Sequence, residues 1–594
     1  MIPASISPAL YRQAFLVGAV FAVYGGTFGY PFQFDGIKEI LHNQVIKDIS
    51  RIDLIWNYNP SRFLLFFSFA VNHALGGVDT FGYHLYNILL HVGATLLVYH
   101  FIGLLFRAAA RLEGEGQNRQ MAGALQFFMA LIYAVHPLNT QAITYIWQRS
   151  ASMVAVFYLF SMVAYLKSSL DQMDGAPQER WKPWRALALA TALAAMLTKQ
   201  SAFTLPMALV LMEYLVISGS VARLRQRAIW LAPFLPLLLI VPLLTVFYQA
   251  GEVTHLAIRA VDVPPPLHYL FTQFDIIILY LKLMVFPVGQ NLDHHFILVT
   301  SFWDSADSFA LLMAILAAGV WLGRKNPMAS FGVLFFFLTM SVESSFFPLP
   351  DWVFEHRMYL PSVGLYIALA ALAETTTRNR GRNVRWSLLA VAVAAVALLG
   401  VATVKRNQVW ATSASLWEDV VKKSPDQARG YINLGSVKKR AGEYSRAQEL
   451  YEKAVELGGG AAEVHHDLGV LKRISGDLAG AETSLRMARK LKPDMIITAL
   501  ELGKVLEAQG KYMQAGAEYT AAANLSPTFI AAHSHLAALL EKMGKPDLAE
   551  KVYMNILKQN PGDGGALEAM ARLLRARGEN DAAEEYAARA TQTE

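Results

Sequence analysis

Residues 433–447 read NLGSVKKRAGEYSRA, and residues 467–481, which lie 34 positions later, read DLGVLKRISGDLAGA. The same spacing continues to the end of the chain. Glycine recurs at Gly442, Gly476, Gly510, Gly544 and Gly578, and alanine at Ala447, Ala481, Ala515, Ala549 and Ala583. A period of this length is typical of repeat proteins, in which each copy is one small structural unit. Because a copy can hold two short helices joined at its glycine, the pattern predicts an α-helical solenoid of five repeats over residues 428–594.

Other positions of the repeat support this prediction. An apolar residue recurs at Leu434, Leu468, Leu502, Leu536 and Met570, and proline at Pro425, Pro493, Pro527 and Pro561. The repeats resemble the tetratricopeptide repeat (TPR), and residues 405–427 are expected to form a connector with a half repeat from Ser413 to Pro425. A solenoid binds extended peptides or partner helices in its concave groove. The residues that we expect to contact an acceptor or partner protein there are Asn433, Lys438, His465 and His533.

Residues 1–404 have a different composition. The whole chain is 54% hydrophobic and 16% charged, and its charged residues are concentrated after about residue 404. This composition excludes a disordered or wholly soluble protein and indicates a bilayer-embedded domain before the solenoid. The chain has no cysteine, which excludes disulfides and thiolate chemistry. The net charge of +6 lies in short clusters beside apolar runs, and we therefore set nucleic-acid binding aside.

The expected membrane domain contains about eleven candidate spans. They lie at about 13–32, 82–106, 121–135, 150–167, 186–198, 202–217, 228–247, 309–323, 328–344, 359–374 and 386–404. The basic clusters near residues 107–119, 180–185, 223–227, 324–325 and 378–385 mark cytoplasmic loops, which places the amino end inside and the carboxyl end outside. All clusters fall on one side only if residues 268–286 do not cross, and we predict a re-entrant or surface-lying helix there.

Two long outer segments remain, residues 33–81 and 287–308, and long loops are often functional. His294 and His295 are adjacent in the second segment, but no third ligand at zinc-like spacing accompanies them, and we do not interpret them as a metal site. Cations are rare in short outer loops. Five nevertheless lie outside at or near helix ends, namely Arg51, Arg62, Arg149, Lys199 and Arg357.

These cations and one acid suggest a reaction. Arginine and lysine side chains that converge from distant spans favour a phosphate or pyrophosphate at the outer membrane face. Asp35 lies just beyond the first apolar run, where its carboxylate is placed to accept a proton from an acceptor hydroxyl while the phosphate leaves. An ordinary turn aspartate and lipid-headgroup anchors are the alternatives for these residues.

Longer stretches resemble a known family. They are FQFDGIKEI (32–40), YNPSRFLLFFSFAVNHALGG (58–77), GYHLYNILLH (82–91), HPLNTQAITYIWQRSASM (136–153), LTKQSAFTLP (197–206) and EHRMYLPSVGLYIALA (355–370). Together with the repeats, they resemble the transmembrane-and-tetratricopeptide O-mannosyltransferase family and its bacterial relatives, whose membrane part has the C-type glycosyltransferase fold. The fold class expected is therefore all-α: a polytopic membrane domain at 1–404, the connector, and a TPR solenoid.

The resemblance implies a polyprenyl-phosphate-linked sugar donor and an acceptor on the non-cytoplasmic side. Asp35 matches the first acid of the family's paired-acid motif and would be the catalytic base. Arg149, Lys199 and Arg357 would hold the donor phosphate, with His356 and Glu355 beside them, and Arg62 joins this group as an outer cation. Other polar positions that match the family at the outer ends of spans are His84, Asn87, His91, His136 and Asn139.

Three acids of the family pattern are absent. Gly36 stands where a second acid is common, and Gln141 and Gln200 replace two glutamates. Fewer carboxylates weaken the argument for magnesium or manganese, which bind charged oxygen ligands. We expect no metal site and no required cofactor, although a divalent cation is left open, and Asp35 remains nearly the only base.

The leading hypothesis is an integral membrane glycosyltransferase that moves a sugar from a polyprenyl phosphate to an acceptor, expected to be a protein, presented by the repeats. An alternative enzyme transfers a preassembled glycan en bloc to protein or lipid. A membrane-anchored TPR scaffold for periplasmic assembly belongs to another class, and a transporter is disfavoured because the notable polar residues lie at span ends. A bacterial chain would lie in the inner membrane with a periplasmic solenoid, and a eukaryotic one in the endoplasmic reticulum with a luminal solenoid.

Overall fold

The computed structural model describes residues 7–113, 119–251, 264–378 and 380–592. The chain forms two compact units, of which the first ends at Lys423 and the second begins at Ser424. Within the described ranges every regular element is a helix and no strand occurs. The expected all-α class, with apolar membrane-type helices followed by repeats, is confirmed.

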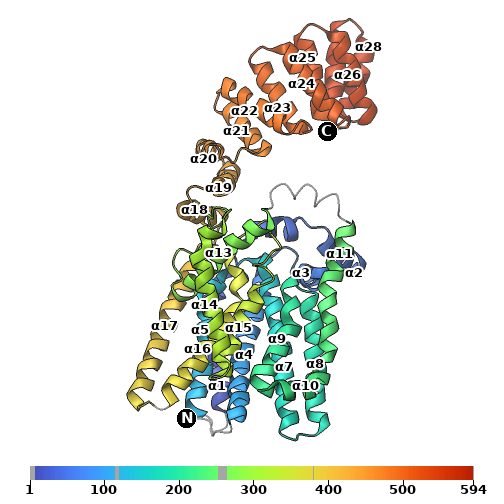
Figure 1. The fold of residues 1–594 in the computed structure, drawn as a ribbon. Coiled ribbons are helices and arrows are strands. Elements are labelled where there is room, and N and C mark those ends of the chain that lie inside the picture. Colours follow the sequence, from blue (N-terminus) through green and yellow to red (C-terminus); the bar gives the residue numbers. More distant parts are fainter. Residues whose placement is uncertain (1–6, 114–118, 252–263, 379, 593–594) are drawn as a thin grey trace, which may run out of the picture. The chain divides into compact units, whose positions relative to one another are not determined.

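The first unit is built from helices of very different length. The longer ones are α1 (Pro8–Tyr24), α4 (Thr80–Glu113), α5 (Arg119–Val135), α7 (Arg149–Met173), α8 (Gln178–Met196), α13 (Pro266–Val285), α14 (Ala306–Leu322), α15 (Pro327–Met340), α16 (Pro361–Arg378) and α17 (Arg382–Gln408). The shorter ones are α2 (Ile52–Tyr58), α3 (Phe63–Gly76), α6 (Thr140–Ile143), α9 (Leu205–Met212), α10 (Val221–Arg227), α11 (Ile240–Gly251) and α18 (Ser413–Lys423). Figure 1 shows most of the long helices of this unit running side by side.

Fewer helices satisfy the requirements for a span than the eleven that we expected. In the described residues six helices are long and apolar enough to cross a membrane, or up to eight if two bent pairs each count as one span. The remaining expected runs do form helices, but α1 and α15 have only 17 and 14 residues. A helix rises 1.5 Å per residue, and such lengths fall short of the ~30 Å hydrocarbon core unless adjoining turns extend them.

Proline explains both bends. A 50° break separates residues 121–135 from 137–143 at Pro137, and a 73° break separates residues 221–230 from 232–245. The second break precedes a 3₁₀ segment, Ala232–Leu239, that contains Pro233 and Pro236. Proline lacks an amide hydrogen and its ring clashes with the preceding turn, so that a regular α-helix cannot continue through it.

Helix α13 covers the stretch that we expected to lie on the outer surface. Its length and composition also allow it to cross a bilayer. The surface-lying arrangement and the orientation derived from it therefore stay predictions.

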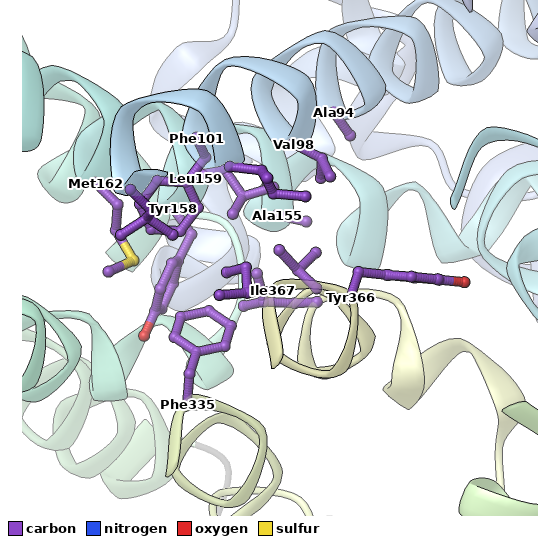
Figure 2. Packing of buried hydrophobic residues seen from close by; sticks show 14 of the residues in the cluster. Ala94, Val98, Phe101, Ala155, Tyr158, Leu159, Met162, Phe335, Tyr366 and Ile367 are labelled. Atoms are coloured by element: carbon purple, nitrogen blue, oxygen red, sulfur yellow. The ribbon is translucent and has the colours of Figure 1, made fainter. Parts of the chain in front are cut away.

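The core of the first unit is assembled from α4, α7, α15 and α16. Figure 2 shows Val98 and Phe101 of α4 facing Ala155 and Leu159 of α7, with Phe335 of α15 nearby. Two glycines bring α15 and α16 unusually close, since a Cβ at Gly332 would lie 2.4 Å from the carbonyl oxygen of Gly364. Small residues at crossing points are typical of helix pairs that pack within membranes.

The first outer segment, residues 33–81, is a folded layer of short helices. Its apolar side chains form their own cluster, which includes Ile46, Ile55, Phe66 and Phe69. The segment thus has a small apolar core of its own, as its aromatic and aliphatic content allows.

The second unit is a stack of helix pairs, as the 34-residue period predicts. The pairs are α19 (Ala428–Arg440) with α20 (Tyr444–Glu456), α21 (Ala462–Ile474) with α22 (Leu478–Leu491), α23 (Ile496–Ala508) with α24 (Tyr512–Leu525), α25 (Ile530–Lys542) with α26 (Pro546–Gln559), and α27 (Gly564–Ala576) with α28 (Asn580–Thr591). The repeated glycine lies between the two helices of each pair with a positive φ, for example 88° at Gly476, which other residues rarely adopt. The repeated alanines are fully buried, and Ala481 is one of them.

Candidate active site

Asp35 lies in the turns that follow α1 and is bound to one tyrosine. The Tyr145 hydroxyl donates a hydrogen bond to Asp35 Oδ2 (3.1 Å), and the Asp35 amide donates to the Tyr145 oxygen (3.0 Å). The preceding residue, Phe34, has a φ of 47° and is the one non-glycine residue with positive φ in the described part of the chain. Residues held in this region tend to mark functional sites, because surrounding contacts must maintain the strain.

Three of the expected phosphate-binding cations gather around one carboxylate. Lys199 Nζ lies 2.5 Å from Glu343 Oε1, and Arg357 Nε lies 3.6 Å from Glu343 Oε2. Arg62 is near enough to act electrostatically on both Lys199 and Glu343. Burial raises the pKa of Glu343, but the positive charges of Lys199 and Arg357 outweigh it and lower that pKa below its ordinary value. We call Arg62, Lys199, Glu343 and Arg357 the cation cluster.

The cation cluster borders a pocket between α7, the C-terminal end of α15 and the N-terminal end of α16. Side chains of both polar and apolar type line it: Ala151, Val154, Lys199, Ser201, Thr339, Met340, Glu343, His356, Arg357, Tyr359, Leu360 and Pro361. Two cations beside apolar side chains suit a ligand that combines an anionic head with an apolar tail.

Arg357 also fixes the segment that carries Glu343. Its Nη1 donates to the carbonyl oxygen of Trp352 (2.7 Å), and its Nη2 donates to that of Asp351. Helix α13 supports the same segment, since the Tyr269 hydroxyl donates to the Glu343 carbonyl oxygen (2.9 Å). Asp351 is near enough to Tyr145, the hydrogen-bond partner of Asp35, to act on it electrostatically.

His356 lies beside the cations as a neutral group. Its amide donates to Gln141 Oε1 (2.8 Å), and its Nδ1 lies 3.2 Å from the same oxygen. Burial, and then the charges of Lys199 and Arg357, lower its pKa well below the usual 6.5. Gln141, one of the three positions where an acid is absent, thus meets His356 with an uncharged amide.

Glu355 forms a second polar centre behind His356. It accepts hydrogen bonds from the Asn291 amide (2.6 Å), from Gln290 Nε2 (2.9 Å) and from His294 Nε2 (2.9 Å). Burial raises the pKa of Glu355. The hydrogen bond from His294 and the charge of Arg406 outweigh this effect, so that the pKa lies below its ordinary value. His294 therefore serves as a partner of Glu355.

Arg149 does not join the cation cluster. Its side chain is buried and donates to Asn87 Oδ1 (2.8 Å), Ser68 Oγ (3.0 Å) and the Tyr83 carbonyl oxygen (3.2 Å). Aromatic faces cover it, with its Cζ 4.4 Å from the ring centroids of Phe69 and Tyr86. These contacts use all three guanidinium nitrogens, so that the expected contact with donor phosphate stays a prediction.

The other polar positions bind backbone groups. Each connects a helix end to a neighbouring segment: His84 to the Tyr30 carbonyl, Asn87 to the Ile143 carbonyl, His91 to the Ala134 carbonyl, His136 to the Met284 carbonyl and Asn139 to the Tyr133 carbonyl. These bonds satisfy carbonyl groups that helix ends leave open. Asn87 is the one of these five that also binds Arg149 in the contacts described, and the expected place of the others in the site stays a prediction.

The expected groove residues make only local contacts in the second unit. Asn433 Nδ2 donates to the Arg429 carbonyl oxygen (2.9 Å), Lys438 pairs with Glu443 (3.2 Å), and His533 Nε2 lies 3.0 Å from the Pro527 carbonyl oxygen. Burial lowers the pKa of His465. None of these observations identifies a ligand, and the groove assignments stay predictions.

Sequence reasoning missed Glu343 and Tyr145. Glu343 lies at the end of the apolar run 328–344, where it is a lone acid beside a span, and that isolation was the available signal. Tyr145 lies within the motif at 136–153, but a tyrosine carries no mark that separates it from a core residue. In the described ranges no three His, Asp or Glu side chains are grouped so as to hold a metal ion.

Comparison with known proteins finds a repeat family and several relatives that this chain resembles. The family model for the tetratricopeptide repeat matches residues 432–496 and 535–593. Human protein O-mannosyl-transferase TMTC4 is 22% identical over 494 residues, which cover 73% of this chain and 65% of that protein. Drosophila melanogaster protein O-mannosyl-transferase Tmtc3 is 25% identical over 448 residues, covering 66% of this chain and 47% of that protein. Caenorhabditis elegans protein O-mannosyl-transferase F38B6.6 is 22% identical, covering 73% of this chain and 60% of that protein.

The chain thus spans about half to two thirds of the length of these relatives. Among solved structures, the crystal structure of MamA is 21% identical and covers 27% of this chain and 94% of its own, with a TM-score of 0.26. These matches agree with the resemblance that the sequence motifs indicate: the chain is similar to transmembrane-and-tetratricopeptide O-mannosyltransferases over two thirds to three quarters of its length, and its C-terminal region matches the tetratricopeptide repeat.

Proposed function

We propose that this protein is a membrane glycosyltransferase that transfers a sugar, most simply mannose, from a polyprenyl-phosphate donor to a hydroxyl of an acceptor protein. The observation that carries the proposal is the cation cluster: three cations from distant parts of the sequence gather around one carboxylate beside a pocket that both polar and apolar side chains line. The names of the relatives supply the sugar and the acceptor class.

In the proposed reaction the acceptor hydroxyl attacks the anomeric carbon as the bond between that carbon and the phosphate oxygen breaks. The hydroxyl proton passes to the Asp35 carboxylate, and the electron pair of the broken bond leaves with the phosphate. Direct displacement inverts the anomeric centre. The Tyr145 hydroxyl, which donates to Asp35 Oδ2, orients the carboxylate for this role.

The cation cluster would hold the departing phosphate. Lys199 and Arg357 provide charge-assisted hydrogen bonds to phosphate oxygens, and an arginine fork binds two oxygens at once. In the present arrangement Glu343 neutralises part of their charge. Donor binding would therefore exchange one anion, the carboxylate, for another, the phosphate.

Several further features belong to the same proposal. The outer face is the periplasm for a bacterial inner-membrane protein and the lumen for a protein of the endoplasmic reticulum, and the solenoid lies on that side and binds the acceptor or a partner. Domain limits at 1–404, 405–427 and 428–594 would separate catalysis, connection and binding. We propose that Asp35 acts without a required cofactor.

The test compares Asp35→Asn with the parent in purified full-length protein. The assay supplies radiolabelled mannosyl polyprenyl phosphate and a mixture of serine- and threonine-containing peptides, and mass spectrometry identifies the product. Loss of a general base lowers the rate by roughly 10²–10⁴-fold. The matched control is Asp48→Asn, which removes an exposed acid of the same outer segment that binds only Ser50 in the contacts described.

Each outcome separates the hypotheses. Transfer of one hexose that depends on Asp35 supports the proposal. Parental transfer by Asp35→Asn contradicts the base assignment, and absence of transfer by the parent with intact partner binding favours the TPR scaffold. Products that carry several sugars, from a donor with a preassembled glycan, indicate en bloc transfer.

A further inference from the structure

The two residues before Asp35 are held by a segment almost four hundred positions later in the chain. The Ser413 hydroxyl donates to Gln33 Oε1 (2.8 Å), and Gln33 Nε2 donates to the Trp410 carbonyl oxygen (3.4 Å). The Phe34 ring packs edge-on against Trp417 of α18, with centroids 5.7 Å apart. The Gln33 side chain is buried, so that these bonds are shielded from water.

The same segment also contacts the tyrosine that binds Asp35. The Trp410 indole stacks on the Tyr145 ring, with centroids 5.3 Å apart and an interplanar angle of 23°. Trp410 and Trp417 are 1% and 4% exposed. Residues 410–417 therefore contact both the side chains of the two residues before Asp35 and the tyrosine that binds Asp35.

Helix α18 is also tied to the other polar centre of the site. Arg406 of α17 pairs with Asp419 (2.7 Å), and Lys423 Nζ donates to the Gln290 carbonyl oxygen (2.6 Å). Gln290 donates in turn to Glu355, which directly precedes His356 and Arg357. One short helix thus connects the Asp35 loop with the segment that supplies the phosphate-binding residues.

We propose that helix α18 positions the Asp35 carboxylate, with Ser413 and Trp417 as positioning residues; this inference rests on the proposed function. Phe34 holds a left-handed backbone conformation that an aromatic residue adopts only under constraint. Without Trp417 and Ser413, residue 34 relaxes to negative φ, and the chain direction at Asp35 changes. The carboxylate then leaves Tyr145 and the reacting hydroxyl.

The proposal gives a role to the connection between the two units. Lys423, the last residue of α18, is followed directly by Ser424, the first residue of the second unit. The helix that orients Asp35 is therefore also the covalent link to the repeats. A half repeat, as the sequence alone suggests for residues 413–425, would serve the solenoid, whereas the contacts of α18 serve the first unit.

The first experiment measures transfer kinetics with mannosyl polyprenyl phosphate and the peptide mixture. Trp417→Ala is expected to lower kcat at least 30-fold with KM for the donor unchanged within twofold, and Trp417→Phe is expected to restore most of the rate. Ser413→Ala is expected to lower kcat about fivefold. The matched control is Trp181→Ala, because Trp181 is equally buried (6% exposed) but packs against Trp230 in another part of the unit.

The second experiment reports the Asp35 loop without any activity. The chain has no cysteine, and a Cβ at Gly36 would meet only Phe32 and Trp147, at ordinary distances of 3.9–4.0 Å. Gly36→Cys therefore introduces a single buried thiol next to Asp35. Labelling of this thiol by a maleimide is expected to accelerate at least tenfold when Trp417→Ala is added and to stay at the parental rate when Trp181→Ala is added.

The outcomes are distinct. A loss of kcat with faster labelling supports the positioning role. Unchanged labelling, or a kcat loss no greater than that of Trp181→Ala, overturns it. If Trp417→Ala does not fold, the positioning role is judged from Ser413→Ala and Trp417→Phe instead. In that case a parental kcat in Ser413→Ala overturns the proposal. If Asp35→Asn retains transfer, the proposed function fails, and the labelling result alone still decides whether α18 holds the loop.

Discussion

Arg149 and Arg357 are both buried arginines of motifs that resemble family motifs, yet they lie in opposite environments. Arg149 is enclosed by an amide, a hydroxyl, a carbonyl and two aromatic faces. Arg357 likewise donates to two backbone carbonyls, those of Asp351 and Trp352, but it also faces the Glu343 carboxylate and lines a pocket together with Lys199. In the described part of the chain Arg149 has no acidic partner, whereas the cation cluster combines three cations with one acid.

This difference indicates that the two buried arginines have different roles. The bonds of Arg149 fix Asn87 and the segment around residue 146, and an incoming anion would have to break them. Arg357 lies beside the Glu343 carboxylate. An incoming anion can take the place of that carboxylate next to Arg357 without leaving the cation unpaired. We therefore assign Arg149 to the architecture of the site and Arg357 to ligand binding, and the following experiments test this division.

The largest effect is expected for Arg357→Gln. Removing a charged donor that stabilises a leaving group costs roughly 10²–10³ in rate, and we expect a fall in transfer of about 10³-fold with the protein still folded. The measurement is transfer from mannosyl polyprenyl phosphate at saturating peptide. The control is Arg51→Gln, an exposed arginine paired with Asp53 in the first outer segment. A loss below tenfold would contradict the assignment.

Arg149→Lys is expected to destabilise the fold more than it slows the folded enzyme. One ammonium cannot reach Asn87, Ser68 and the Tyr83 carbonyl together, and each lost charged hydrogen bond costs about 1.5–3 kcal/mol. We expect a loss of about 3 kcal/mol, seen as a fall of several degrees in the temperature of thermal aggregation. Transfer per folded molecule should stay within about threefold. The reverse pattern, full stability with lost transfer, would indicate that Arg149 binds the donor.

The sequence predicted the solenoid nearly residue by residue because its contacts recur at a fixed spacing. Gly476 adopts positive φ and Ala481 is buried where the period requires them. The membrane unit differs, because its contacts join residues far apart. The apolar runs located its helices, but hydropathy alone did not reveal which runs are too short to cross or where prolines bend them.

The site was predictable only in part for the same reason. Asp35 stood out from its place after the first apolar run, and Lys199 and Arg357 from their place outside. Their partners did not stand out, because Glu343 and Tyr145 acquire their roles from contacts that no local pattern encodes. Arg149 did stand out in the sequence, but its position there does not reveal whether its guanidinium binds a ligand or the protein itself.

Glu343→Gln tests the exchange of anions directly. Without the carboxylate, three cations repel one another, and we expect a loss of about 2 kcal/mol in the unliganded protein. Added inorganic pyrophosphate should raise the thermal midpoint of the variant more than that of the parent, because the anion replaces the missing charge. Glu374→Gln, which pairs with Arg378 at the other end of α16, serves as the control. Equal stabilisation of parent and variant would contradict the exchange.

The sign of the pH dependence of Glu343 also follows from its lowered pKa. A carboxyl whose folded-state pKa is depressed contributes stability above its unfolded pKa, near 4.5, and loses that contribution as pH falls through the folded value. The parent should therefore lose stability below about pH 4.5, and the variant should lose less.

His356→Gln provides the smallest and most specific test of the cation cluster. The pKa of His356 is lowered because burial and the charges of Lys199 and Arg357 disfavour the imidazolium. The unfolded chain then binds a proton below its ordinary pKa of about 6.5 that the folded protein does not bind, and stability must fall as pH falls. Between pH 7 and pH 5.8 this single group costs about 1 kcal/mol.

Glutamine does not titrate, and the thermal midpoint of the variant should therefore decline less than that of the parent over that interval, while the other buried histidines contribute equally in both proteins. His42→Gln removes an exposed histidine of the first outer segment and should decline as the parent does. A variant that declines as steeply as the parent would mean that the folded protein binds the proton at His356, and the contrast with Arg149 would then be lost.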